Sequence, residues 1–216
     1  MTVMPMFPLG SVLMPAMPLP LRIFEPRYLK LLGDLMGSEN PEFGVVLIER
    51  GDEVGGGEKR MTLGTIASVI NIGTTQEFYG LESFGTQRFR VTSWLPDDPY
   101  PLAVIELVPD LVWDDTLLDS KNQLETKVRQ LLAFASEFTN LQFGASTELS
   151  DDPMEACWQL AGILPIGELD QMDLLSSASA EELISRTFEI VTTADQTLRD
   201  IMAQQGEWEN PTFNDS

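Results

Sequence analysis

Carboxylates are the most numerous side chains in this sequence that could take part in catalysis or metal binding. The chain holds 34 Asp and Glu residues among 216. Neighbouring acids occur at Asp97-Asp98, Asp114-Asp115, Asp151-Asp152 and Glu181-Glu182, and at Asp170 with Asp173 on one expected helix face. General acid and base catalysis needs two carboxylates in unlike environments within a pocket, which adjacent acids rarely provide. We interpret these pairs as helix caps and solvated surface groups, because no loop has the spacing of an EF-hand.

Other catalytic chemistry is limited by the residues that are missing. The sequence has no histidine and a single cysteine, Cys157, so Ser-His-Asp and Cys-His catalysis and the usual zinc sites lack their components. Cys157 lies beside Trp158 with no cation near it in sequence, and we expect it to be a packing residue. The segment Gly55–Lys59 lacks the spacing of a phosphate-binding loop and is interpreted as a surface turn. We predict no catalytic residue, no cofactor and no metal site.

The charge balance restricts the class of partner. Thirteen Lys and Arg residues leave a net charge of -21, which repels nucleic acids and anionic lipids because their binding depends largely on basic residues. The five prolines between residues 5 and 20 interrupt any signal-peptide helix. No apolar run approaches the ~18 residues of a membrane span. The sequence therefore predicts a cytoplasmic protein that binds neither nucleic acid nor membrane.

The first half of the chain has the pattern of a β-rich structure. Pro and Gly punctuate four apolar runs typical of strands, at residues 43–48, 65–72, 88–94 and 102–108. Helices do not alternate with these runs, so we expect a compact sheet or barrel. One helix is predicted from about Glu25 to Leu35, with Pro26 in its first turn and Gly37 as its stop. Glu25 as N-cap would place Phe24 and Leu29 in a hydrophobic staple.

After residue 112 the periodicity becomes helical. Apolar residues recur on one face of a helix predicted from about Ser120 to Leu141. Two further helix starts are indicated by the capping sequences Asp152-Pro-Met-Glu155 and Ser179-Ala-Glu-Glu182. We accordingly predict three parts: a β-rich domain over 1–110, a helical bundle over 111–205, and a frayed acidic tail over 206–216.

Several segments together resemble one known family. Phe7-Pro-Leu9 is followed by a proline-rich apolar loop and then by Leu21-Arg-Ile-Phe-Glu-Pro-Arg-Tyr28 before the first helix. The later segments that match in order are 43–48, 63–67, 85–91, Leu160–Pro165, Asp170-Gln171 and Leu174-Leu175. This arrangement is similar to the N-terminal substrate-binding domain of Lon proteases. The first block of matches covers about half of the chain.

The resemblance implies an α+β fold, in which a β-rich, PUA-like pseudobarrel is followed by a small helical bundle. It also implies a non-catalytic module that binds proteins, with unfolded or extended polypeptide as client and strand-edge pairing as one mode. The ATPase and Ser-Lys peptidase domains of the protease do not fit in this length, so we expect a free-standing form that serves as an adaptor for a separate protease. The alternative is a carboxylate-dependent hydrolase or peptidase of unknown substrate. RNA binding, which PUA-like folds can support, is disfavoured by the charge.

The candidate protein-binding residues lie between residues 14 and 28. They are Met14, Met17, Leu19, Arg22, Phe24 and Tyr28. An apolar loop from Met14 to Pro20, between strand and helix, is a candidate exposed surface. Methionine suits surfaces that accept varied apolar partners, but it also fills irregular gaps in cores, and both interpretations stay open. For the segment from Leu21 to Tyr28, a scaffold role at the start of the helix competes with direct contact.

Overall fold

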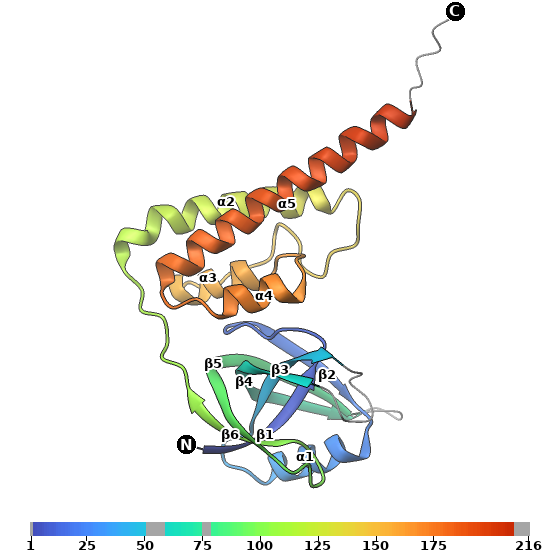
Figure 1. Cartoon of the computed structure of the whole chain (residues 1–216), viewed down its shortest axis with the longest axis vertical. Coiled ribbons are helices and arrows are strands. Elements are labelled where there is room, and N and C mark those ends of the chain that lie inside the picture. Colours follow the sequence, from blue (N-terminus) through green and yellow to red (C-terminus); the bar gives the residue numbers. More distant parts are fainter. Residues whose placement is uncertain (1, 51–58, 75–78, 210–216) are drawn as a thin grey trace, which may run out of the picture.

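Six strands close around one another in the first part of the molecule. The computed structural model describes residues 2–50, 59–74 and 79–209. The strands are β1 (Thr2–Leu9), β2 (Pro18–Ile23), β3 (Glu42–Arg50), β4 (Lys59–Thr74), β5 (Tyr79–Leu95) and β6 (Leu102–Leu107). Their order is β2-β5-β4-β3-β1-β6, and β6 also pairs with β5 (Figure 1). Since β1 is parallel to β3 and the other pairs are antiparallel, the sheet is mixed.

The predicted apolar runs account for much of this sheet. Each of the four runs falls within β3, β4, β5 or β6, apart from Val108, which follows β6. The strands β4 and β5 have 16 and 17 residues, and register shifts interrupt their pairing. Such irregularities bend and twist strands, which lets two long strands take part in a closed sheet. The β-rich pseudobarrel expected from the resemblance is therefore present.

Strand β2 was not predicted as a strand. Its first three residues, Pro18–Pro20, were assigned to the apolar loop, but they pair antiparallel with Phe84, Ser83 and Glu82 of β5. Prolines are tolerated in a sheet at an edge, and β2 is the strand that begins the sheet order. Because Pro18 and Pro20 have no N–H group, this edge offers few donors to an added strand.

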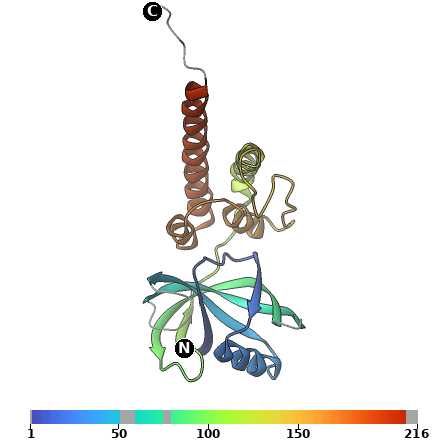
Figure 2. The ribbon, with the colours of Figure 1, turned by 90° about the vertical axis from the view of Figure 1, so that its right-hand side faces the viewer.

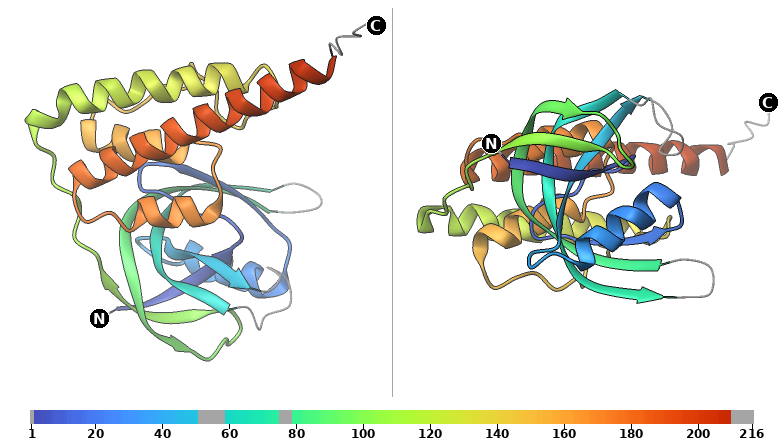
Figure 3. Two further views of the ribbon diagram at one scale, coloured as in Figure 1. Left: turned by 45° about the horizontal axis from the view of Figure 1, so that its top comes forward. Right: turned by 90° about the horizontal axis from the view of Figure 1, so that it is seen from below.

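The second part of the molecule is helical. It contains a short 3-10 helix, η1 (Asp115–Leu117), followed by α2 (Leu118–Ala135), α3 (Pro153–Gly162), α4 (Glu168–Leu175) and α5 (Ala180–Glu209). The helices α3 and α4 lie next to the β-rich part, and α2 and α5 lie farther away (Figures 1 and 3). The far end of α5 extends beyond the other helices (Figure 2). The whole chain thus has the expected α+β architecture.

The starts of three helices agree with the sequence. Helix α1 (Pro26–Met36) has Glu25 as its N-cap residue and Pro26 in its first turn, although Phe24, expected in a hydrophobic staple, is 63% exposed. The Asp152 carboxylate accepts hydrogen bonds from the Met154 and Glu155 N–H groups, each at 2.9 Å. At α5 the Glu182 N–H donates to Ser179 Oγ at 3.1 Å, and the Glu182 carboxylate accepts from the Ala178 N–H. At α3 and α5 these side-chain acceptors satisfy N–H groups that have no partner within the helix, whereas Glu25 makes no side-chain cap bond at α1.

Helix α2 ends earlier than its apolar pattern predicts. The helix stops at Ala135 rather than near Leu141, and residues 136–138 continue in turns. The Ser136 hydroxyl donates to the Ala133 carbonyl, and the N–H groups of Glu137 and Phe138 bond three residues back. Local bonds of this kind tighten and end a helix. Phe138, assigned to the buried face, is consequently 49% exposed.

A shared apolar core joins the two parts. The larger cluster includes Phe43 and Leu63 from the strands together with Trp158, Leu174 and Leu183 from the helices. A smaller cluster, which includes Met6 and Phe89, lies within the β-rich part alone. The predicted boundary near residue 110 falls between β6 and η1, and division into two domains stays a prediction. The segment 55–58 and the residues 210–216 of the expected tail lie outside the described residues, whereas α5 continues to Glu209.

Candidate protein-binding surfaces

The loop between β1 and β2, residues 10–17, lies where the two parts of the molecule meet, and we call it the junction loop. On the sheet side, the Ala16 N–H donates to the Gly85 carbonyl at 2.8 Å, and the Gly85 N–H donates to the Met17 carbonyl at 2.9 Å. On the helical side, Gln159 Nε2 of α3 donates to the Ala16 carbonyl at 3.1 Å. The loop is therefore bonded to both β5 and α3.

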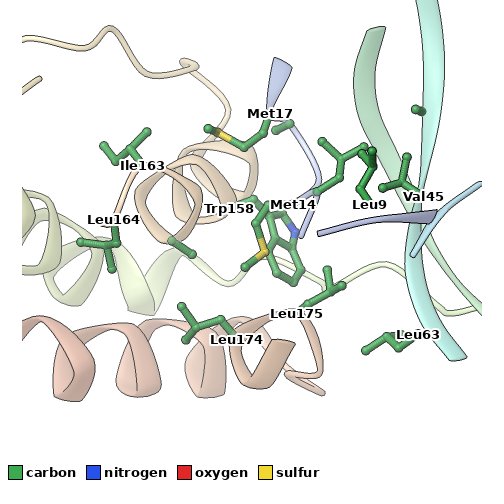
Figure 4. Close-up of a cluster of buried hydrophobic side chains, with 14 of the residues drawn as sticks. Leu9, Met14, Met17, Val45, Leu63, Trp158, Ile163, Leu164, Leu174 and Leu175 are labelled. Atoms are coloured by element: carbon green, nitrogen blue, oxygen red, sulfur yellow. The ribbon is translucent and has the colours of Figure 1, made fainter. Parts of the chain in front are cut away.

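The methionines of the junction loop are buried. Met14 and Met17 are only 2% and 7% exposed, and Figure 4 shows them in one apolar cluster with Trp158. Met17 packs against Gly162 of α3, where an added Cβ would lie 2.6 Å from Met17 Cγ. The expected exposure of the loop does not extend to these two side chains, because α3 covers them. Of the two interpretations of methionine, gap filling is the one found here.

Of the other four candidate residues, Leu19 lines one pocket together with Met14 and Met17, whereas Arg22, Phe24 and Tyr28 do not line it. Tyr28 is 3% exposed, and its ring stacks on that of Phe7 with centroids 3.9 Å apart. Leu19 is partly buried, whereas Arg22 and Phe24 are exposed. Helix α1, which contains Tyr28, lies at the end of the barrel opposite the helical part (Figure 1). A role for any of the six in protein binding stays a prediction, and Leu19, Arg22 and Phe24 are the ones that solvent reaches.

Arg88 of β5 holds the helical part against the sheet, a role that sequence reasoning did not identify. Its guanidinium is buried and donates to the carbonyls of Leu175 and Ser177 at 2.8 and 2.7 Å. It also lies over the Trp158 ring, 5.1 Å from the centroid. Burial lowers the pKa of Arg88, and the nearby Asp110 carboxylate opposes that shift. The guanidinium also donates to the Pro109 carbonyl at 3.2 Å. Because two of its three carbonyl partners lie in the α4–α5 turn, Arg88 anchors this turn to the sheet.

An apolar groove lies on the helical part, between α2 and α5, and we call it the α2–α5 groove. Its volume is about 700 Å³. Its apolar lining includes Leu131 and Ala135 of α2 with Ile190, Ala194 and Leu198 of α5, and Leu141, Pro165 and Ile166 complete it from the connecting segments. The two carboxylates in its lining are Asp170 and Glu189, and no Lys or Arg of the described ranges lines it. No sequence signal marks the groove, since α2 and α5 are far apart along the chain.

Two ionisable side chains, Cys157 and Asp114, have structural roles. Cys157 is fully buried, and burial raises the pKa of its thiol to about 11, so the packing interpretation is confirmed. Hydrogen bonds from Thr116 hold the pKa of Asp114 below its ordinary value, because this carboxylate caps η1. Among the residues that the structure describes, no three His, Cys, Asp or Glu side chains are grouped to hold a metal ion. None of the described helices is both long and apolar enough to cross a bilayer.

Comparison with known proteins decides the family. The model of the ATP-dependent protease La (LON) substrate-binding domain matches residues 3–193. The chain belongs to the LON substrate-binding domain family. Lon protease 2 of Sorangium cellulosum (strain So ce56) is 33% identical over 119 residues, which are 54% of this chain and 15% of the relative. The chain thus spans a small part of the length of that curated protease.

Solved structures agree with this LON-type fold. The Lon N-terminal domain protein from Xanthomonas campestris has a TM-score of 0.59 at 26% identity, and the match covers 89% of this chain and 98% of that one. The N-terminal domain of Mycobacterium avium complex Lon protease has a TM-score of 0.61 at 12% identity, over 90% and 98% of the two chains. The second similarity supports the fold alone. Both span the β-rich and the helical parts, so the α+β fold expected from the resemblance is confirmed.

Proposed function

We propose that this LON substrate-binding domain is a non-catalytic module that binds segments of non-native polypeptide. The α2–α5 groove is the observation that carries the proposal, because it is open, apolar and of the volume of a small-ligand or peptide site. Unfolded chains expose apolar side chains that native proteins bury, so such a groove selects for them. Family membership supports substrate binding as the class of function.

The geometry favours groove binding over strand addition. The strand at the start of the sheet order, β2, has prolines at positions 18 and 20, and β6 pairs with both β1 and β5. An incoming strand gains affinity mainly from main-chain hydrogen bonds, and the β2 edge has few donors for them. Apolar side chains on the client, rather than its backbone, therefore supply the contacts in our proposal.

We further propose that the module works as an adaptor, which presents its clients to a protease. The relative that matches here is named a protease, and the 119 matched residues are 15% of its length. Adaptor activity predicts that adding the module to a Lon-type protease accelerates degradation of an unfolded client and leaves a native one untouched. An unchanged degradation rate at saturating module would overturn the adaptor step alone.

The binding proposal is tested with two forms of one protein. A small disulfide-bonded protein is labelled and compared in its native form and after reduction and blocking with iodoacetamide, which keeps it unfolded. We expect fluorescence anisotropy to show saturable binding of the unfolded form and none of the native form. Equal affinity for the two forms, or no binding of either, would contradict the proposed function.

A further inference from the structure

The length of the α2–α5 groove matches a short helix. Its wall on α5 runs from Glu189 to Ile201, which corresponds to about 18 Å at 1.5 Å per residue. That distance is about three helical turns. A helix of this length presents three or four apolar side chains on one face at i, i+3 or i+4, and i+7. The apolar residues of α5 in the groove, Ile190, Ala194, Leu198 and Ile201, follow the same spacing.

The helical walls of the groove, which supply most of its lining, offer little to the backbone of an extended peptide. Its α2 and α5 walls are helical, so their main-chain groups are already bonded within each helix. The hydroxyl of Thr193 donates to the Glu189 carbonyl, and that of Thr197 donates to the Thr193 carbonyl. An extended segment would lose water from its N–H and C=O groups without new partners, whereas a helix satisfies its own. The groove therefore favours a helical occupant.

The charge around the groove favours an occupant that carries positive charge. Some acids elsewhere on α4 and α5 are paired, as Asp173 is with Arg186 and Asp195 with Arg199. Asp170 and Glu189, the two acids of the groove, have no ion pair within the described residues. They are exposed and sit beside apolar residues, where an incoming Lys or Arg would find a partner. A second copy of this chain is a poor occupant, because each copy has a net charge of -21.

We propose that the α2–α5 groove binds an amphipathic helix whose apolar face is flanked by Lys or Arg. The helix is a client segment that is disordered in solution and becomes helical as it binds, so this inference rests on the proposed function and names its preferred client. Apolar side chains of the client pack on Leu131, Ile190 and Leu198, and its cations pair with Asp170 and Glu189.

Four labelled synthetic peptides of fourteen residues provide the probes. The first has Leu at helical spacing with Lys at its flanks. The second replaces each Lys by Glu, the third has the first composition in an order without an apolar face, and the fourth has one central proline. We expect the first peptide to bind at least about tenfold more tightly than each of the others. Equal affinity for the Lys and Glu peptides would overturn the charge preference, and equal affinity for the proline peptide would overturn the helical occupant.

Two double variants of the protein locate the site. Asp170→Lys with Glu189→Lys reverses the groove acids, and Asp119→Lys with Glu106→Lys makes the same change of net charge at exposed positions that do not line the groove. We expect the groove variant to lose about tenfold in affinity for the Lys peptide and to gain affinity for the Glu peptide. Circular dichroism checks that both variants fold. The same loss of affinity in both variants would show a general effect of charge and overturn the site.

The reduced and blocked protein, which tests the proposed function, also separates this inference from that function. The wild-type chain and the groove variant are each tested with the unfolded form and with the Lys peptide. If both proteins bind both ligands equally tightly, the groove proposal is wrong while the proposed function stands. If the wild-type chain binds neither the unfolded form nor any peptide, the proposed function fails as well.

Discussion

The clearest single-residue effect is expected at Arg88. Its buried guanidinium donates to carbonyls that lie 87 and 89 residues farther along the chain. Arg88→Met keeps much of the apolar stem but leaves those carbonyls without a donor. We expect the free energy of unfolding to fall by about 2–4 kcal/mol. Chemical denaturation measures this loss, and Arg90→Met, an exposed arginine of the same strand, is the matched control. A loss of the same size in both variants would contradict the anchor role.

The titration of Cys157 gives a prediction about pH. Burial raises its thiol pKa from 9.0 to about 11, so the folded protein holds this proton more tightly than the unfolded chain does. The stability contributed by the protonated thiol is full below pH 9.0 and is lost as pH rises towards 11. We expect Cys157→Ala to show a shallower fall of unfolding free energy across this range than wild type shows. Parallel curves from equilibrium denaturation would rule out the thiol as the source.

At the scale of elements, helix caps are the testable local signal. The Asp152 carboxylate accepts from two N–H groups at the start of α3, while its neighbour Asp151 is exposed and makes no such cap. Asp152→Ala should destabilise the protein by about 1 kcal/mol, and Asp151→Ala should change the stability by less than about 0.5 kcal/mol. Thermal unfolding of the two variants side by side tests the difference. Indistinguishable melting temperatures would show that the cap contributes nothing measurable.

These elements also show what the sequence could predict. Caps such as Asp152 and Ser179 bond to N–H groups within three residues, and the proline after Glu25 marks a helix start. Local sequence patterns were therefore sufficient to predict these helix starts. The strand β2 was missed because its prolines indicate a loop unless the edge position is known. The end of α2 was placed too late because the apolar period continues into Phe138, past the turns that follow Ala135.

The candidate site was harder to predict than the fold, for a physical reason. Whether Met14 is exposed depends on α3, which follows it by about 140 residues, and an apolar loop has the same sequence pattern in either case. The α2–α5 groove likewise exists only where two distant helices meet. The sequence places Arg88 in a strand but does not indicate its anchor role, because its partners are not neighbours in sequence.

At the scale of the whole molecule, one core connects the sheet and the helices. Buried residues from β3, the junction loop, α3 and α5 belong to the same apolar cluster. We therefore expect a single cooperative thermal transition rather than separate melting of two domains. In scanning calorimetry the calorimetric and van't Hoff enthalpies should agree. Two resolved peaks, or a calorimetric enthalpy well above the van't Hoff value, would show that the parts unfold independently.

The burial of the junction loop has a consequence during synthesis on the ribosome. The chain emerges from its N-terminal end, so β1 and the junction loop appear long before β6 and α3. Thr2 cannot meet its partner Ile105 until β6 has emerged, and Met17 cannot meet Gly162 until α3 has emerged. A nascent chain of this protein consequently carries the same kind of exposed apolar segment that we propose the finished module binds.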